Sequence, residues 1–150
     1  MPDTLIVAIG SSVMTDDAIG HHIIKQLEQL NVNAEVVDLG MDLFRLRLLF
    51  HNQKRIIIVD AMKGNYPPGT ILEYKYQKNQ DLLEAKIRDI HHIGSIEALD
   101  IMCLADIDLA KIDIYFVGVI IETIEKGLEL SPEIKNAIPN AVEKIISLII

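Results

Sequence analysis

Carboxylates stand at the ends of two apolar segments of this sequence. Asp16 and Asp17 follow shortly after residues 4–9, and Asp60 closes residues 55–60. A segment that is apolar on both faces is typical of a strand in a parallel sheet covered by helices. Ligand sites of such sheets lie beyond the carboxyl ends of the strands, so these three carboxylates are the first candidates for chemistry.

Two adjacent imidazoles, His91 and His92, precede a further segment with a helical pattern. Two carboxylates and one imidazole form a ligand set that suits Ni, Zn, Cu or Fe. The sequence contains no H-E-x-x-H and no paired C-x-x-C. A metal site would therefore depend on the fold to bring distant residues together.

Each of these residues also has a purely structural interpretation. Asp16, Asp17 or Thr15 would serve as the N-cap of the helix that follows. Asp60 would be a polar residue that closes a buried strand, and a histidine in a surface loop is usually solvated. One cap residue is enough for one helix, so the second carboxylate remains available for another role.

Other kinds of chemistry find less support. Ser11 and Ser12 follow a strand, but no G-x-S-x-G surrounds them and the segment lacks the glycine spacing of nucleotide-binding loops. Cys103 lies among apolar neighbours, as a buried core residue does. His21 and His22 fall in the first turns of a helix, and we interpret them as rim or surface residues.

The alternation of strand and helix patterns predicts the fold. Strands are expected at residues 4–9, 34–39, 55–60, 70–76 and 113–121, the fourth with the alternating pattern of a half-exposed edge strand. Helices are expected at residues 19–30, 42–50 and 94–104 and from Ser131 onward. Right-handed βαβ units then give a three-layer α/β/α sandwich of about five mostly parallel strands with one antiparallel edge strand. Residues 1–150 are expected to form one domain.

The strand order decides whether the candidate residues meet. If the first and third strands flank the point where the order reverses, their carboxyl ends face each other across one crevice. The loop with Asp16 and Asp17 and the strand end with Asp60 would then lie at the same edge of the sheet.

Composition narrows the kinds of partner. The net charge of -8 argues against nucleic acid, because binding a duplex requires Lys and Arg to neutralise phosphates. Cys103 is the one cysteine, so no intramolecular disulfide forms, which fits a reducing compartment. Neither a secretion signal nor an apolar run long enough to span a membrane is recognisable. We expect a cytoplasmic protein with neither a nucleic acid nor a membrane as partner.

A series of short motifs resembles, in the same order, those of the hydrogenase maturation endopeptidases. Residues 10–20 are similar to the opening motif of that family, roughly G-N-x-x-x-x-D-[DE]-x-x-G, and residues 91–99 to its H-x-x-G-[LI]-x-[DE]-x-L segment. The resemblance continues at residues 37–40, 58–61, 68–70 and 116–132. The matches are collinear and cover nearly the whole chain.

This resemblance implies an endopeptidase that removes the C-terminal extension of a nickel-loaded [NiFe]-hydrogenase large-subunit precursor. It implies that Asp17, Asp60 and His91 are both the catalytic and the metal-recognising residues, and that Asp38 helps to hold the substrate. Nickel would be recognised in the substrate precursor rather than held as a permanent cofactor. The precursor is the expected partner, and the protease itself is expected to be a monomer.

The chemistry of the cut stays open at the level of sequence. Either a metal polarises the carbonyl or activates water, or a carboxylate acts as general base on water. Two other functions are also compatible with the scaffold. One is a non-proteolytic nickel-binding maturation chaperone, and the other is a flavodoxin-like binder of a nucleotide or small ligand.

Overall fold

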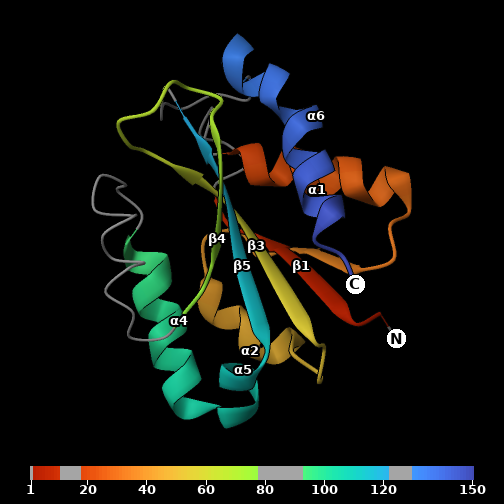
Figure 1. The fold of residues 1–150 in the computed structure, drawn as a ribbon, viewed down its shortest axis with the longest axis vertical. Coiled ribbons are helices and arrows are strands. Elements are labelled where there is room, and N and C mark those ends of the chain that lie inside the picture. The colour runs from red at the N-terminus through yellow and green to blue at the C-terminus, as the bar shows by residue number, and fades with distance from the viewer. Residues whose placement is uncertain (1, 11–17, 78–92, 122–129) are drawn as a thin grey trace.

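The computed structural model describes residues 2–10, 18–77, 93–121 and 130–150, and of residues 93–97 the backbone only. These residues form one five-stranded sheet with helices on both faces (Figure 1). The strands are β1 (Thr4–Ala8), β2 (Glu35–Asp38), β3 (Arg55–Met62), β4 (Ile71–Lys75) and β5 (Asp113–Ile120).

The strands follow the order β2-β1-β3-β5-β4. All neighbouring pairs are parallel except β4 and β5, which are antiparallel, so β4 is an antiparallel edge strand. The expected three-layer architecture is therefore confirmed, including the edge strand predicted from its alternating pattern.

One detail of the third strand differs from the prediction. The sequence pattern ended this strand at Asp60, but β3 continues to Met62 because residues 60–62 pair with Gly118, Val119 and Ile120 of β5. Asp60 consequently lies inside the strand near its carboxyl end, and its side chain is fully buried.

Helices α1 (Ile19–Leu30) and α6 (Pro132–Ser147) cover one face of the sheet. The buried side chains of this layer are aliphatic and include Ile23, Leu27, Ile134 and Ile145, which pack on strand residues such as Ile57. The carbonyl of Ser131 accepts the first backbone bonds of α6, from Ile134 and Lys135, as the Ser-Pro-Glu pattern predicted.

The other face is covered by four shorter or more apolar segments: η2 (Leu43–Arg45), α2 (Leu46–Leu49), α4 (Ile93–Ala105) and α5 (Ile107–Lys111). The helix expected at residues 42–50 is thus a 3₁₀ turn followed by one α-helical turn. Leu99, Met102 and Cys103 of α4 pack on this face of the sheet, and Cys103 is a buried core residue as expected.

Both chain ends lie at the amino edge of the sheet, where the parallel strands begin (Figure 1). The backbone N–H of Ile150 donates to Thr4 Oγ1 at 3.1 Å. Nearby, Arg55 donates from Nη2 to Asp113 Oδ2 at 3.1 Å and from Nη1 to the Leu148 carbonyl at 3.0 Å. These contacts join the first residues of three strands to the end of α6.

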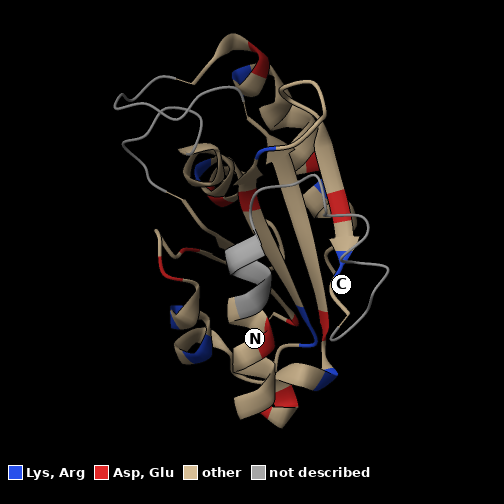
Figure 2. Cartoon of the chain, turned by 90° about the vertical axis from the view of Figure 1, so that its left-hand side faces the viewer, with Lys and Arg blue, Asp and Glu red and all other residues tan. Residues whose placement is uncertain are grey.

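Two further features of the described residues are the lengths of the apolar helices and the distribution of charge. Among the described residues, no helix is both long and apolar enough to cross a membrane. Figure 2 shows Lys and Arg as short separate segments interleaved with Asp and Glu.

Candidate active site

The strand order reverses between β1 and β3. From β1 the chain moves to β2 on one side and then crosses back to β3 on the other. Ala8, the last residue of β1, pairs with Asp38 of β2 and with Val59 of β3. The first and third strands therefore flank the switch point, which is where open α/β sheets bind ligands.

Asp60 lies at this switch point on the face covered by α4. Its strand neighbours Ile58 and Met62 belong to the core on the α4 side, whereas Val59 and Ala61 belong to the core on the α1 side. Because side chains alternate along a strand, the carboxylate of Asp60 points toward the α4 layer. Burying a charged carboxylate costs free energy, so such residues are commonly kept for function or for a specific partner.

Gly118 makes room for the side chain of Met62, which lies on the same face of the sheet as Asp60. Gly118 is the register partner of Asp60 on β5, and a Cβ placed on it would clash with Met62 Sδ. The thioether of Met62 therefore occupies the space that a larger residue at position 118 would need. This keeps the neighbourhood of the carboxylate closely packed.

Gly20 brings the first turn of α1 onto the same edge of the sheet. A Cβ at this position would lie 3.0 Å from Ala8 Cβ and 3.2 Å from the Ile9 carbonyl oxygen. Glycine thus allows the start of α1 to approach the ends of β1 and β3. Ala18 occupies the N-cap position of α1 and has no side-chain acceptor.

His21 and Asp38 form a hydrogen-bonded pair at the same edge. His21 Nδ1 and Asp38 Oδ2 are 2.7 Å apart, and Asp38 Oδ1 accepts the backbone N–H of Gly40 at 2.9 Å. Both side chains are about 30% exposed. Asp38 lies on the α1 face, because its register partner Ala8 belongs to the core on that side.

His22 is the neighbour of His21 on the first turn of α1. Its ring meets the ring of His21 edge-on, with 5.8 Å between the centroids. Partial burial, followed by the proximity of His21 and of Lys25, lowers the pKa of His22 below its usual value. Both histidines were interpreted as rim residues. They differ in their contacts: among the described residues, only His21 is paired with a carboxylate.

Of the three predicted site residues, the structure places Asp60. Asp17 and His91, like their neighbours Asp16 and His92, lie outside the described residues, so the meeting of the trio stays a prediction. Within residues 2–10, 18–77, 93–121 and 130–150, no three His, Cys, Asp or Glu side chains form a group able to hold a metal. The sequence motifs pointed to Asp38, but they did not indicate its contact with His21.

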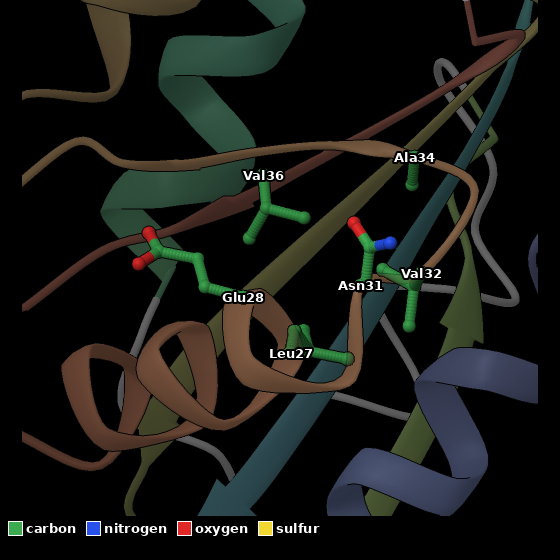
Figure 3. A pocket seen from close by; sticks show the side chains of 6 residues that line it. All are labelled: Leu27, Glu28, Asn31, Val32, Ala34 and Val36. Carbon is green, nitrogen blue, oxygen red and sulfur yellow. The ribbon is translucent and has the colours of Figure 1, made fainter.

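The shallow pocket in Figure 3 lies at the other end of α1. It has a volume of about 240 Å³ and is lined by Leu27, Glu28, Asn31, Val32, Ala34 and Val36. These residues lie at the end of α1, in the connection to β2 and in β2 itself, so the pocket lies away from Gly20 and His21. Its lining offers no titratable pair comparable to His21 and Asp38.

Comparison with known proteins assigns the family. The model of the hydrogenase maturation protease family HycI matches residues 20–148. The chain belongs to the hydrogenase maturation protease family. Protein FrxA of Pyrococcus furiosus is 38% identical over 136 residues, which are 91% of this chain and 97% of that protein.

Solved structures of maturation proteases share the fold. The [NiFe] hydrogenase maturation protease HybD of Thermococcus kodakarensis has a TM-score of 0.85 at 29% identity, covering 98% of this chain and 99% of that one. The hydrogenase maturating endopeptidase HybD of Escherichia coli has a TM-score of 0.76 at 25% identity, covering 96% and 90%. The family membership makes this chain a peptidase.

Proposed function

We propose that this maturation protease removes the C-terminal extension of a nickel-loaded [NiFe]-hydrogenase large-subunit precursor. The family and the names of its relatives support a hydrogenase precursor as substrate. The observation that supports placing the active site at the switch point is Asp60, a fully buried carboxylate near the end of β3.

In this proposal Asp17, Asp60 and His91 contact the nickel of the precursor. Asp60 faces the α4 layer, and His91 precedes the first residue of α4 by two positions. Asp17 stands just before α1, whose first turn packs on the ends of β1 and β3 through Gly20. The three residues would thus approach the switch point from both layers.

Nickel acts here as a recognition handle that belongs to the substrate. Two carboxylates and one imidazole suit nickel and leave coordination positions for the ligands of the precursor. Holding the ion fixes the scissile bond beside the three side chains, which is how positioning lowers a barrier. Water then adds to the carbonyl carbon, the C–N bond breaks, and the released amine takes up the proton.

Intact-mass spectrometry tests the reaction. The purified protein is incubated with nickel-loaded and with nickel-free precursor, and the masses are compared over time. We expect loss of a C-terminal peptide from the loaded form only. If the protein binds the loaded precursor but neither form loses mass, the non-proteolytic nickel chaperone replaces the protease.

Adjacent residues of the same type provide matched controls for the site. Asp17→Asn and His91→Gln should abolish cleavage, whereas Asp16→Asn and His92→Gln should leave most of it. The members of each pair are one position apart in the chain, so a general loss of charge or of local structure would affect both members. Equal activity of the two members of a pair would contradict the assignment at that position.

A further inference from the structure

In the His21–Asp38 pair, the carboxylate fixes the orientation of the imidazole ring through Nδ1. An ionised carboxylate only accepts hydrogen bonds, so the proton of the neutral ring is on Nδ1 and the lone pair is on Nε2. Both oxygens of Asp38 are in use, Oδ2 by His21 at 2.7 Å and Oδ1 by the Gly40 N–H at 2.9 Å. The carboxylate is thereby fixed in orientation, and it fixes the ring in turn.

Nε2 of His21 has no hydrogen-bond partner in the part of the chain that the structure describes. The side chain is 31% exposed, so part of the ring faces solvent. A hydrogen-bonded pair this exposed contributes little to stability. A role in stability therefore does not explain why the ring is held in one tautomer.

The pair lies on the opposite side of the switch point from Asp60. Asp38 ends β2 on the α1 face, β1 lies between, and Asp60 is on β3 and points to the α4 face. Asp38 and Asp60 thus stand two strands apart at the carboxyl edge, with the end of β1 between them. A peptide chain that ran along this edge from Asp60 across the end of β1 would reach Asp38 and the His21 ring bonded to it.

We propose that His21 is a substrate-contact residue, whose Nε2 accepts a hydrogen bond from a backbone N–H of the precursor tail. Asp38 is the positioning residue that holds the ring. This inference rests on the proposed function, because it takes the precursor tail as the ligand. An extended tail offers unpaired N–H groups, which is the chemistry that a fixed acceptor recognises.

Kinetics on the nickel-loaded precursor test the contact. His21→Phe keeps a planar ring and removes both nitrogens, and we expect KM to rise about fivefold to tenfold with kcat within about twofold. His21→Gln carries an amide oxygen near the position of Nε2 and should recover most of the loss. His22→Phe, one residue along, is the matched control and should change KM less than about twofold.

A double-mutant cycle tests the role of Asp38. Asp38→Ala should raise KM, and adding His21→Phe to it should raise KM less than His21→Phe does in the wild type, because the two side chains act together. Additive effects would overturn the positioning role. An unchanged KM in His21→Phe, equal effects of His21→Phe and His22→Phe, or no recovery with Gln would overturn the contact.

Failure of this inference can be told apart from failure of the proposed function. If the wild type cuts and Asp60→Asn does not, but His21→Phe behaves like the wild type, the function stands and the contact falls. If the wild type does not cut, equilibrium binding of the loaded precursor replaces kinetics. His21→Phe should then bind it about fivefold to tenfold more weakly, and equal binding would overturn the contact.

Discussion

At the amino edge of the sheet, polar side chains bind residues far away in the sequence. Arg55 joins Asp113 and the carbonyl of Leu148, and its guanidinium lies over the ring of Tyr115 with 4.9 Å to the centroid. Lys75 reaches the other oxygen of Asp113 at 3.3 Å. Three strands and the C-terminal segment are thereby held together.

The carboxyl edge holds the polar side chains of the proposed site. Asp60 is buried beside a glycine, and His21 is bonded through Nδ1 to Asp38. Contacts at the amino edge join strands and the C-terminal segment, whereas the proposed substrate site lies at the carboxyl edge. Substitutions at the two edges should therefore separate stability from activity.

The largest effect is expected from Asp60→Asn. The substitution keeps the shape of the side chain and removes its charge, so cleavage of the loaded precursor should fall about 10²- to 10⁴-fold. The thermal unfolding midpoint should stay within a few degrees of the wild type, which calorimetry measures. Unimpaired cleavage, or loss of cleavage only through unfolding, would contradict the claim that Asp60 at the carboxyl edge serves activity rather than stability.

Arg55→Met should have the opposite profile. It keeps the aliphatic stem and removes two charge-assisted hydrogen bonds, so the free energy of unfolding should fall by about 2–3 kcal/mol in urea titrations. The cleavage rate of the folded variant should stay near the wild-type rate. Lys54→Met is the control, because its contact with Asp3, at 3.5 Å, is exposed and should contribute less than about 1 kcal/mol.

Gly20→Ala tests a position where the packing of α1 on the strand ends also places the proposed site. The added methyl would meet Ala8 Cβ at 3.0 Å and the Ile9 carbonyl at 3.2 Å, and overpacking of this kind costs about 1–3 kcal/mol. The higher helix propensity of alanine stabilises the folded state by about 1 kcal/mol relative to glycine. We expect a net loss near 1 kcal/mol and a slower cut, since α1 must move away from the strand ends. Wild-type cleavage in this variant would show that the placement of α1 is not critical.

The smallest effect concerns pH and Asp113. The hydrogen bond from Arg55 holds the pKa of this carboxyl below its usual value. Asp113 therefore stabilises the fold above the pKa of the unfolded chain, near 3.9, and this contribution is lost as pH falls through the lower folded pKa. Because the side chain is 42% exposed, Asp113→Asn should cost at most about 1 kcal/mol at pH 7.

Urea titrations at neutral and acid pH measure this difference. The gap in unfolding free energy between the wild type and Asp113→Asn should close as the pH falls from the unfolded pKa through the lower folded pKa, while cleavage at pH 7 is unchanged. A gap that stays constant with pH would show that the charge of Asp113 is not the source of its effect.

The strand and layer arrangement was predictable because it depends on long apolar runs. Residues 4–9 and 55–60 are apolar on both faces, which pointed to covered parallel strands, and the alternation at residues 70–76 pointed to the edge. The end of β3 was placed two residues early, because its extension to Met62 depends on pairing with β5 rather than on local pattern. Helix α5 has five residues, too few to show a periodicity.

The candidate site was predictable only in part. Asp60 was found because a carboxylate at the end of an apolar strand is conspicuous, and its burial agrees with a special role. The His21–Asp38 contact joins residues seventeen positions apart on α1 and β2. It depends on how closely α1 approaches the strand ends, which no local pattern encodes. Asp17 and His91 remain predictions from the family resemblance.

A competition between two precursors tests the central claim most directly. Nickel-loaded precursor and isotope-labelled nickel-free precursor are mixed with the protein in one reaction, and intact masses are followed over time. The account predicts that only the loaded precursor loses its C-terminal peptide. Equal loss from both would contradict the recognition of nickel, and loss from neither would contradict the proposed cleavage.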